Sequence, residues 1–73
     1  MSRRFTAIIE SEGDSYVALC PELDVASQEA TVTEARSNLV EAIELFLETA
    51  SPMELERRLA GEMYITQVEV AFG

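Results

Sequence analysis

The sequence predicts an α+β domain in which a single sheet is covered on one face by helices. Three extended segments near the start, two capped helices in the middle and an alternating apolar segment at the end indicate this class. We expect the element order β-β-β-α-α-β. A chain of 73 residues has room for only one core, so residues 1–73 should form a single domain.

The first three predicted strands are bounded by residues that favour turns. Residues 4–10 alternate in polarity, and residues 12–14 (EGD) supply a turn before the apolar run at residues 16–20. These two strands therefore form a β-hairpin. Pro21 lacks an N–H and ends the second strand, and residues 25–28 form a short third strand.

The first predicted helix begins near Val32. Thr31 and Glu34 fit a capping box, in which the Thr side chain accepts from the backbone N–H three residues on and the Glu reaches back. Apolar residues then recur at the spacing of an amphipathic helix that packs on a sheet. The residues of this stripe are Ala35, Leu39, Ala42, Ile43 and Phe46.

A second, shorter helix should run from Pro52 to about residue 60. Ser51 and Glu54 form a second capping box, Pro52 suits the first helical position, and Gly61 can end the helix. Two basic residues in its last turns complement the helix dipole. They are Arg57 and Arg58.

The chain closes with a predicted strand at residues 63–72, which is rich in β-branched and aromatic residues. We expect it to lie beside the first strand, either parallel or antiparallel to it. A strand-forming terminus, together with exposed apolar helix residues such as Val40 and Leu45, also predicts a homo-oligomer, a dimer or higher.

Charge points to the kind of partner. Fourteen Asp and Glu against five Arg give a net charge of −9, which repels nucleic acid and anionic membranes and favours a basic protein partner. The distribution is uneven, because residues 1–9 carry the positive charges of Arg3 and Arg4 whereas residues 10–29 carry only acidic groups. The alternative is that the charge serves solubility alone.

Four acidic residues of the first helix should form a ridge on the side opposite the apolar stripe. At about 100° per residue they fall within about 80° of one another, and no Lys is spaced to neutralise them. The residues of this acidic ridge are Glu34, Glu41, Glu44 and Glu48.

The residues needed for most enzyme chemistry are missing. The chain has no His, and its single cysteine, Cys20, can form neither a Cys/His pair nor an internal disulfide. Cys20 reads as a small buried apolar residue. Asp14, Glu22 and Asp24 could form a magnesium site or an acid–base pair, but solvated loop acids are the better interpretation. We expect a cytoplasmic protein that is not an enzyme and has no cofactor or metal.

Several segments together resemble the HicB antitoxin family. Residues 16–28 (YVALCPELDVASQ) combine a strand with a Pro-Glu-Leu loop, and residues 33–35 and 38–48 (TEA and NLVEAIELFLE) follow at the family's spacing. Residues 68–70 are similar to that family's closing strand. The resemblance covers nearly the whole chain from Phe5 onward.

The resemblance implies a partial RNase H-like domain without nuclease residues. It also implies a partner, HicA, a small basic mRNA-cleaving toxin that the antitoxin neutralises by occlusion. Many HicB proteins carry a C-terminal DNA-binding domain, which we do not expect in this chain. The candidate partner-binding residues are Glu22, Asp24, Glu41, Glu44 and Glu48.

Two other functions stay open at this point. One is a standalone oligomeric domain that binds a small ligand or another protein. The other is a carboxylate-dependent metal hydrolase.

Overall fold

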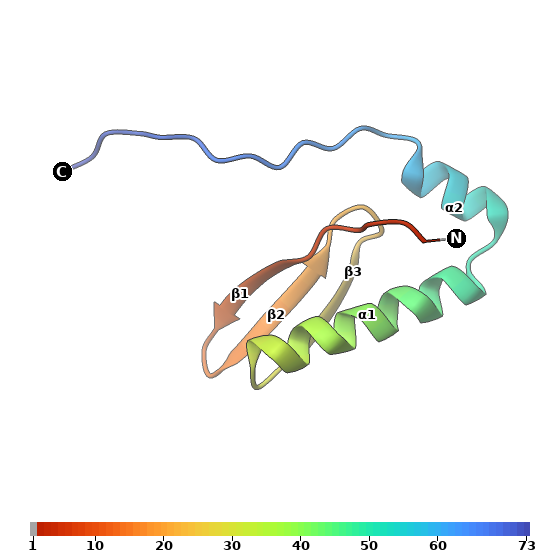
Figure 1. Ribbon diagram of the computed structural model, residues 1–73, viewed down its shortest axis with the longest axis horizontal. Helices are drawn as coiled ribbons and strands as arrows, with labels where there is room; N and C mark the ends of the chain where they lie inside the picture. The colour runs from red at the N-terminus through yellow and green to blue at the C-terminus, as the bar shows by residue number, and fades with distance from the viewer. Residues whose placement is uncertain (1) are drawn as a thin grey trace.

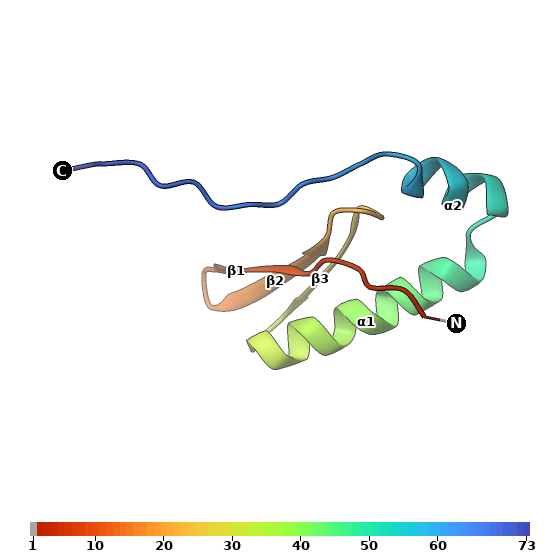
Figure 2. The ribbon, with the colours of Figure 1, turned by 45° about the horizontal axis from the view of Figure 1, so that its top comes forward.

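The computed structural model describes residues 2–73 and confirms the α+β class. Three antiparallel strands form one sheet in the order β1-β2-β3, and helix α1 crosses one face of that sheet (Figure 1). Seen at a second angle, the sheet and α1 form two layers (Figure 2). The elements are β1 (Ile8–Glu12), β2 (Ser15–Cys20), β3 (Val25–Glu29), α1 (Val32–Thr49) and α2 (Pro52–Leu59).

The predicted hairpin is confirmed, and its turn is tight. Glu12 pairs with Ser15, so only Gly13 and Asp14 lie in the loop. Gly13 has a φ of 58°, a left-handed value that a two-residue hairpin turn requires and that glycine adopts without a steric penalty. The Ser15 hydroxyl donates to the Glu12 carbonyl at 3.0 Å and closes the turn.

Strand β1 begins four residues later than predicted, at Ile8. Ile8 pairs with Leu19, so continuing the same register would place Thr6 opposite Pro21. Proline offers no N–H to that ladder. The Thr6 N–H instead donates to the Glu22 carboxylate at 2.9 Å, and the chain before Ile8 continues without a strand partner.

The loop between β2 and β3 is anchored by a buried leucine. Leu23 is fully buried in the core beside Cys20. Asp24 follows with a φ of 55°, a left-handed conformation that Asp tolerates better than most residues. Leu23 is therefore structural, and β2 ends at Cys20, directly before Pro21, as the sequence predicts.

Helix α1 begins and packs as predicted. The Thr31 hydroxyl oxygen accepts from the Glu34 N–H at 3.1 Å, and the hydroxyl donates to the Glu34 carboxylate at 2.9 Å. This differs from the expected box only in that Glu34 reaches the Thr31 side chain rather than its backbone. Ala35 and Leu39 of the stripe are fully buried, and Ile43 and Phe46 pack against the core.

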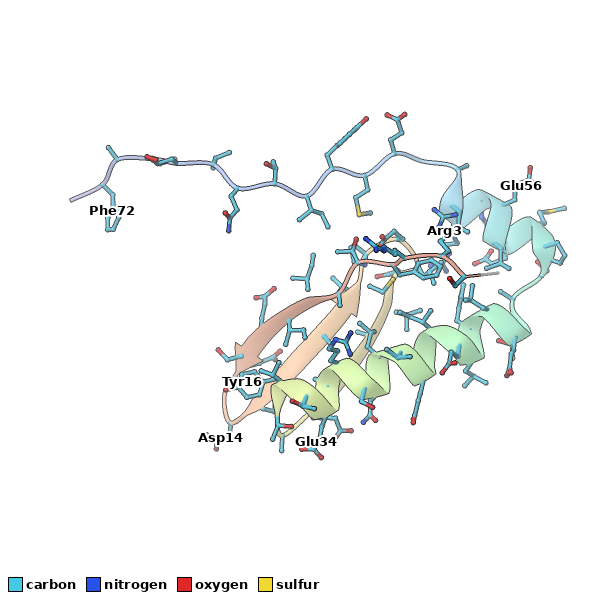
Figure 3. The ribbon with its side chains drawn as sticks, viewed as in Figure 1. Arg3, Asp14, Tyr16, Glu34, Glu56 and Phe72 are labelled. Carbon is cyan, nitrogen blue, oxygen red and sulfur yellow. The ribbon has the colours of Figure 1, made fainter. Side chains whose placement is uncertain are left out.

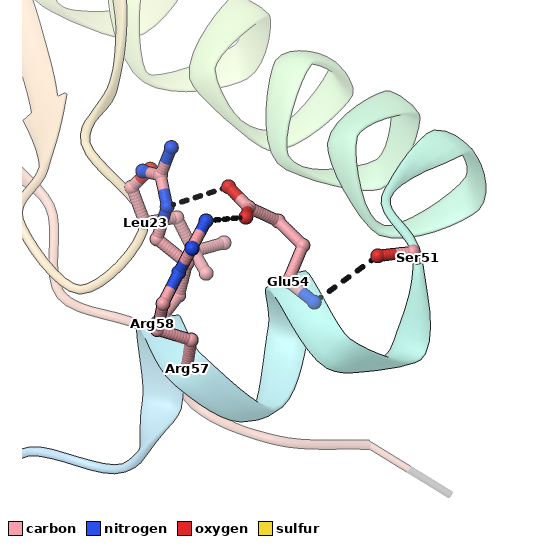
Figure 4. Close-up of polar contacts among 5 residues, drawn as sticks. All are labelled: Leu23, Ser51, Glu54, Arg57 and Arg58. Atoms are coloured by element: carbon pink, nitrogen blue, oxygen red, sulfur yellow. Dashed lines mark hydrogen bonds and ion pairs between the residues drawn. The ribbon is translucent and has the colours of Figure 1, made fainter.

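Helix α2 is held to the rest of the domain by Arg58. The Ser51 hydroxyl accepts from the Glu54 N–H at 3.1 Å, which confirms this cap, and the Glu54 carboxylate binds both Arg57 and Arg58 (Figure 4). Arg58 also donates to the Leu23 carbonyl, and its guanidinium lies 5.4 Å from the centre of the Phe46 ring. Arg58 therefore joins α2 to the β2–β3 loop and to α1, in addition to the predicted interaction with the helix dipole.

The predicted last strand is absent from the sheet. After α2 the chain runs as an extended, exposed segment past the sheet, with no strand assigned in residues 61–73 (Figures 1 and 2). The pattern of the segment is that of a strand, but a strand forms only where a neighbouring edge pairs with its backbone. We call residues 63–72 the C-terminal tail.

The core is small and lies between α1 and the sheet. Its fully buried members come from β2, the β2–β3 loop and α1, and side chains from β1 and α2 pack around them. Within residues 2–73, no helix combines the length and apolar composition that a membrane crossing requires. The buried residues are Ala18, Cys20, Leu23, Ala35 and Leu39.

Candidate protein-binding surface

The acidic ridge lies on the exposed side of α1. Glu34 is at its start, in the first turn of the helix (Figure 3), and Glu41, Glu44 and Glu48 follow along the helix. All four side chains are exposed, while the stripe on the opposite side of the helix is buried or half-buried. The structure thus brings together the three α1 residues that the sequence proposes as partner contacts.

Among residues 2–73, no basic side chain forms an ion pair with the ridge. In the described part of the chain both ion pairs are made by Glu54 of α2, and none involves a ridge residue. Like charges three or four residues apart on a helix each destabilise it by about 0.2–0.5 kcal/mol. Glu41, Glu44 and Glu48 therefore weaken the isolated helix, and a cationic partner would relieve that repulsion.

Glu22 has a structural role in the free chain. Its carboxylate accepts from the Thr6 N–H at 2.9 Å and from the Thr6 hydroxyl at 2.8 Å, and the Cys20 thiol lies 3.6 Å from its other oxygen. Partial burial acts to raise the pKa of Glu22, but the hydrogen bonds from Thr6 outweigh it and hold the pKa below its ordinary value. Glu22 ties the β2–β3 loop to the N-terminal segment.

The five predicted site residues fall into two groups. Glu22 and Asp24 lie in the β2–β3 loop, at the end of the sheet that faces α2 (Figure 1), whereas Glu41, Glu44 and Glu48 are exposed residues of α1. Asp24 is exposed. The two groups therefore belong to separate surfaces, and a partner bound to the ridge need not contact the loop.

Cys20 and the carboxylates form no reactive arrangement among the described residues. Cys20 is fully buried, and desolvation raises the pKa of its thiol, which disfavours the reactive thiolate. Residues 2–73 contain no group of three carboxylate or thiol side chains placed to hold a metal ion.

The structure also shows a groove that the sequence did not predict. A cavity of about 700 Å³ runs between the N-terminal segment and the flank of α1 that faces away from β3. The signal for it in the sequence is that Val40 and Leu47 add apolar residues to α1 beyond the predicted stripe, and both are exposed in the structure. Apolar lining residues include Phe5, Ala7, Leu39, Val40, Ile43 and Leu47, and Arg3 and Arg36 lie at the same groove.

Comparison of this chain with protein-family models, curated proteins and solved structures gives no match. The HicB resemblance therefore rests on the sequence patterns alone.

Proposed function

We propose that this chain is a non-catalytic, antitoxin-like protein that binds and neutralises a small basic toxin of the HicA type. The observation that carries the proposal is the acidic ridge, whose carboxylates are exposed and have no basic partner in residues 2–73. The proposal includes a partial RNase H-like fold, for which the order β-β-β-α is the structural support.

Neutralisation would follow from electrostatic complementarity. An RNA-cleaving protein needs a positive surface to hold its phosphate backbone. A ridge of carboxylates that docks on that surface excludes RNA by occupying the same cations, and a net charge of −9 accelerates the encounter at low salt. The complex would form in the cytoplasm, where mRNA is found and where an unpaired thiol such as Cys20 stays reduced.

The test is binding to a HicA-type protein encoded beside this gene, measured by co-purification and calorimetry. Changing Glu41, Glu44 and Glu48 to Gln should weaken binding by about 3- to 150-fold, since each exposed charge pair contributes about 0.2–1 kcal/mol. The substitutions remove like-charge repulsion within α1, so they should leave the fold intact or stabilise it.

A matched control removes the same charge from the hairpin instead. Glu10→Gln, Glu12→Gln and Asp14→Asn change the net charge by the same three units and should alter binding much less. Equal weakening by both variants would mean that net charge and not the ridge binds the partner. Absence of any complex with a basic neighbour would contradict the toxin-binding function and leave the standalone binding domain as the alternative.

A further inference from the structure

The C-terminal tail has the pattern of a strand but pairs with no strand in the described part of the chain. Its even-numbered side carries four large side chains and Thr66, whereas the odd-numbered side includes Gln67 and Glu69. Tyr64 is 81%, Val68 is 83% and Phe72 is 99% exposed. Figure 3 shows Phe72 far from the sheet and from α1. An exposed alternating segment of this length favours pairing with a sheet edge.

An edge suited to such a strand exists at β1. β1 pairs with β2 on one side only, so its outer edge is unpaired within the described sheet. The groove lies directly beside the segment that leads into β1, with Phe5 and Ala7 on one wall and Val40 and Leu47 on the other. A fourth strand at this edge would cover the groove with the side chains of one of its faces.

We propose that the tail of one copy pairs with the outer edge of β1 in a second copy, and that the second tail does the same in return. The even-numbered side of each tail, with Tyr64, Val68, Val70 and Phe72, covers the apolar groove of the other copy. The result is a two-fold symmetric dimer built by strand exchange. This inference does not depend on the proposed toxin-binding function.

Charge favours the groove beside this edge. Arg3 and Arg36 line it with one carboxylate, that of Glu44, and Arg4 lies in the same N-terminal segment, although β1 itself carries Glu10 and Glu12. Residues 63–73 carry a single charge, that of Glu69, so the tail meets little of the repulsion that two bodies of −9 each exert. The other edge strand, β3, packs much more closely against α1 than β1 does.

The tail passes its own sheet without pairing with it, which leaves its backbone available to a second copy. Glu62 and Met63 lie near Arg3 of the same chain, so the tail starts beside its own N-terminal segment. It then runs past the sheet as an extended segment that pairs with neither edge of the described sheet (Figures 1 and 2). Ten extended residues reach about 33 Å, enough to span the β1 edge of a neighbouring molecule.

The buried area is adequate for a dimer. An aromatic side chain buries about 150–250 Å², so Tyr64 and Phe72 of the two tails together would bury about 600–1,000 Å². The valines and the paired backbone add to this. The total approaches the 1,200–2,000 Å² that is typical of stable interfaces.

The test combines light scattering with hydrogen exchange on the full chain. We expect a mass twice the 8.1 kDa of one chain, with slow exchange in both β1 and the tail. Val68→Glu places a charge on the buried side and should raise the dimer dissociation constant about tenfold or more. Gln67→Glu, its neighbour on the opposite side, adds the same charge and should change the constant by less than about threefold.

Any of four results would overturn the inference. A monomer whose tail is protected would mean that the tail pairs with its own sheet. A monomer whose tail exchanges freely would mean that the tail has no partner. A dimer whose tail exchanges freely, or one that Val68→Glu does not weaken more than Gln67→Glu, would place the interface elsewhere. Circular dichroism checks folding, which the substitutions should preserve because the tail lies outside the core.

Discussion

Replacing Glu22 by Gln tests whether this carboxylate fastens the N-terminal segment to the β2–β3 loop. In the native chain it accepts two hydrogen bonds from Thr6, at 2.9 and 2.8 Å. Pro21, which would lie opposite Thr6 if the strand pairing continued, has no N–H to donate. Gln keeps an acceptor oxygen and nearly the same size but loses the charge. The substitution therefore isolates the charged part of the interaction.

The size of the effect follows from the hydrogen bonds lost. Bonds to a charged group contribute about 1.5–3 kcal/mol each, against about 0.5–1.5 kcal/mol for neutral ones. Glu22 is only half-buried, so we discount two such differences to about 1–2 kcal/mol in total. A domain of this size has a free energy of unfolding of about 4–11 kcal/mol. The melting temperature should fall by about 4–16 °C.

The assay is thermal unfolding by circular dichroism at neutral and at acid pH. Because the folded-state pKa of Glu22 lies below its ordinary value of 4.5, the charge stabilises the fold above that value. Its contribution is lost as the pH falls through the lower, folded-state pKa. The difference between the native protein and Glu22→Gln should therefore shrink in acid.

Glu10→Gln is the matched control, since Glu10 is an exposed residue of β1. It should change the free energy of unfolding by no more than about 0.5 kcal/mol, so its melting temperature should stay close to that of the native protein. Equal melting temperatures for Glu22→Gln and the native protein at neutral pH, or a difference that does not change with pH, would refute the role assigned to Glu22.

A thiol reaction at Cys20 tests the core, and two substitutions of Asp24 test the β2–β3 loop. The Cys20 thiol should react with a thiol reagent at least about tenfold more slowly in the native protein than in denaturant. The reason is that the thiol is fully buried and that desolvation raises its pKa. Equal rates in the two conditions would contradict that burial. The backbone at Asp24 is left-handed, with a φ of 55°. Asp24→Gly should therefore raise the free energy of unfolding by about 0.5–1 kcal/mol, whereas Asp24→Ala should lower it. Denaturant unfolding measures both changes, and changes of the same sign would refute the idea that the backbone is strained at this position.

The features that the sequence predicted correctly are determined by neighbouring residues. The hairpin depends on Gly13, and both helix starts depend on a hydroxyl residue three positions before a Glu. The acidic ridge follows from helical periodicity once α1 is known to pack on the sheet through Ala35 and Leu39. All of these signals lie within a few residues of the structure that they specify.

The features that differed depend on residues distant in the chain. The late start of β1 follows from Pro21, which would lie opposite Thr6, fifteen positions earlier in the chain, and the role of Glu22 follows from its contact with Thr6. Arg58 reaches Leu23 across 35 positions. The tail has the right local pattern, but whether it forms a strand depends on which edge it meets, and that information is not in the segment itself.

The two proposed surfaces use different sides of α1. The stripe faces the sheet, Val40 and Leu47 border the groove, and Glu41 and Glu48 face solvent. A tail seated in the groove would leave those two carboxylates uncovered, and only Glu44 belongs to both surfaces. Strand exchange would therefore not block the ridge. It would place two ridges on one particle of twice the charge, which raises the rate of encounter with a cationic partner and allows bivalent binding.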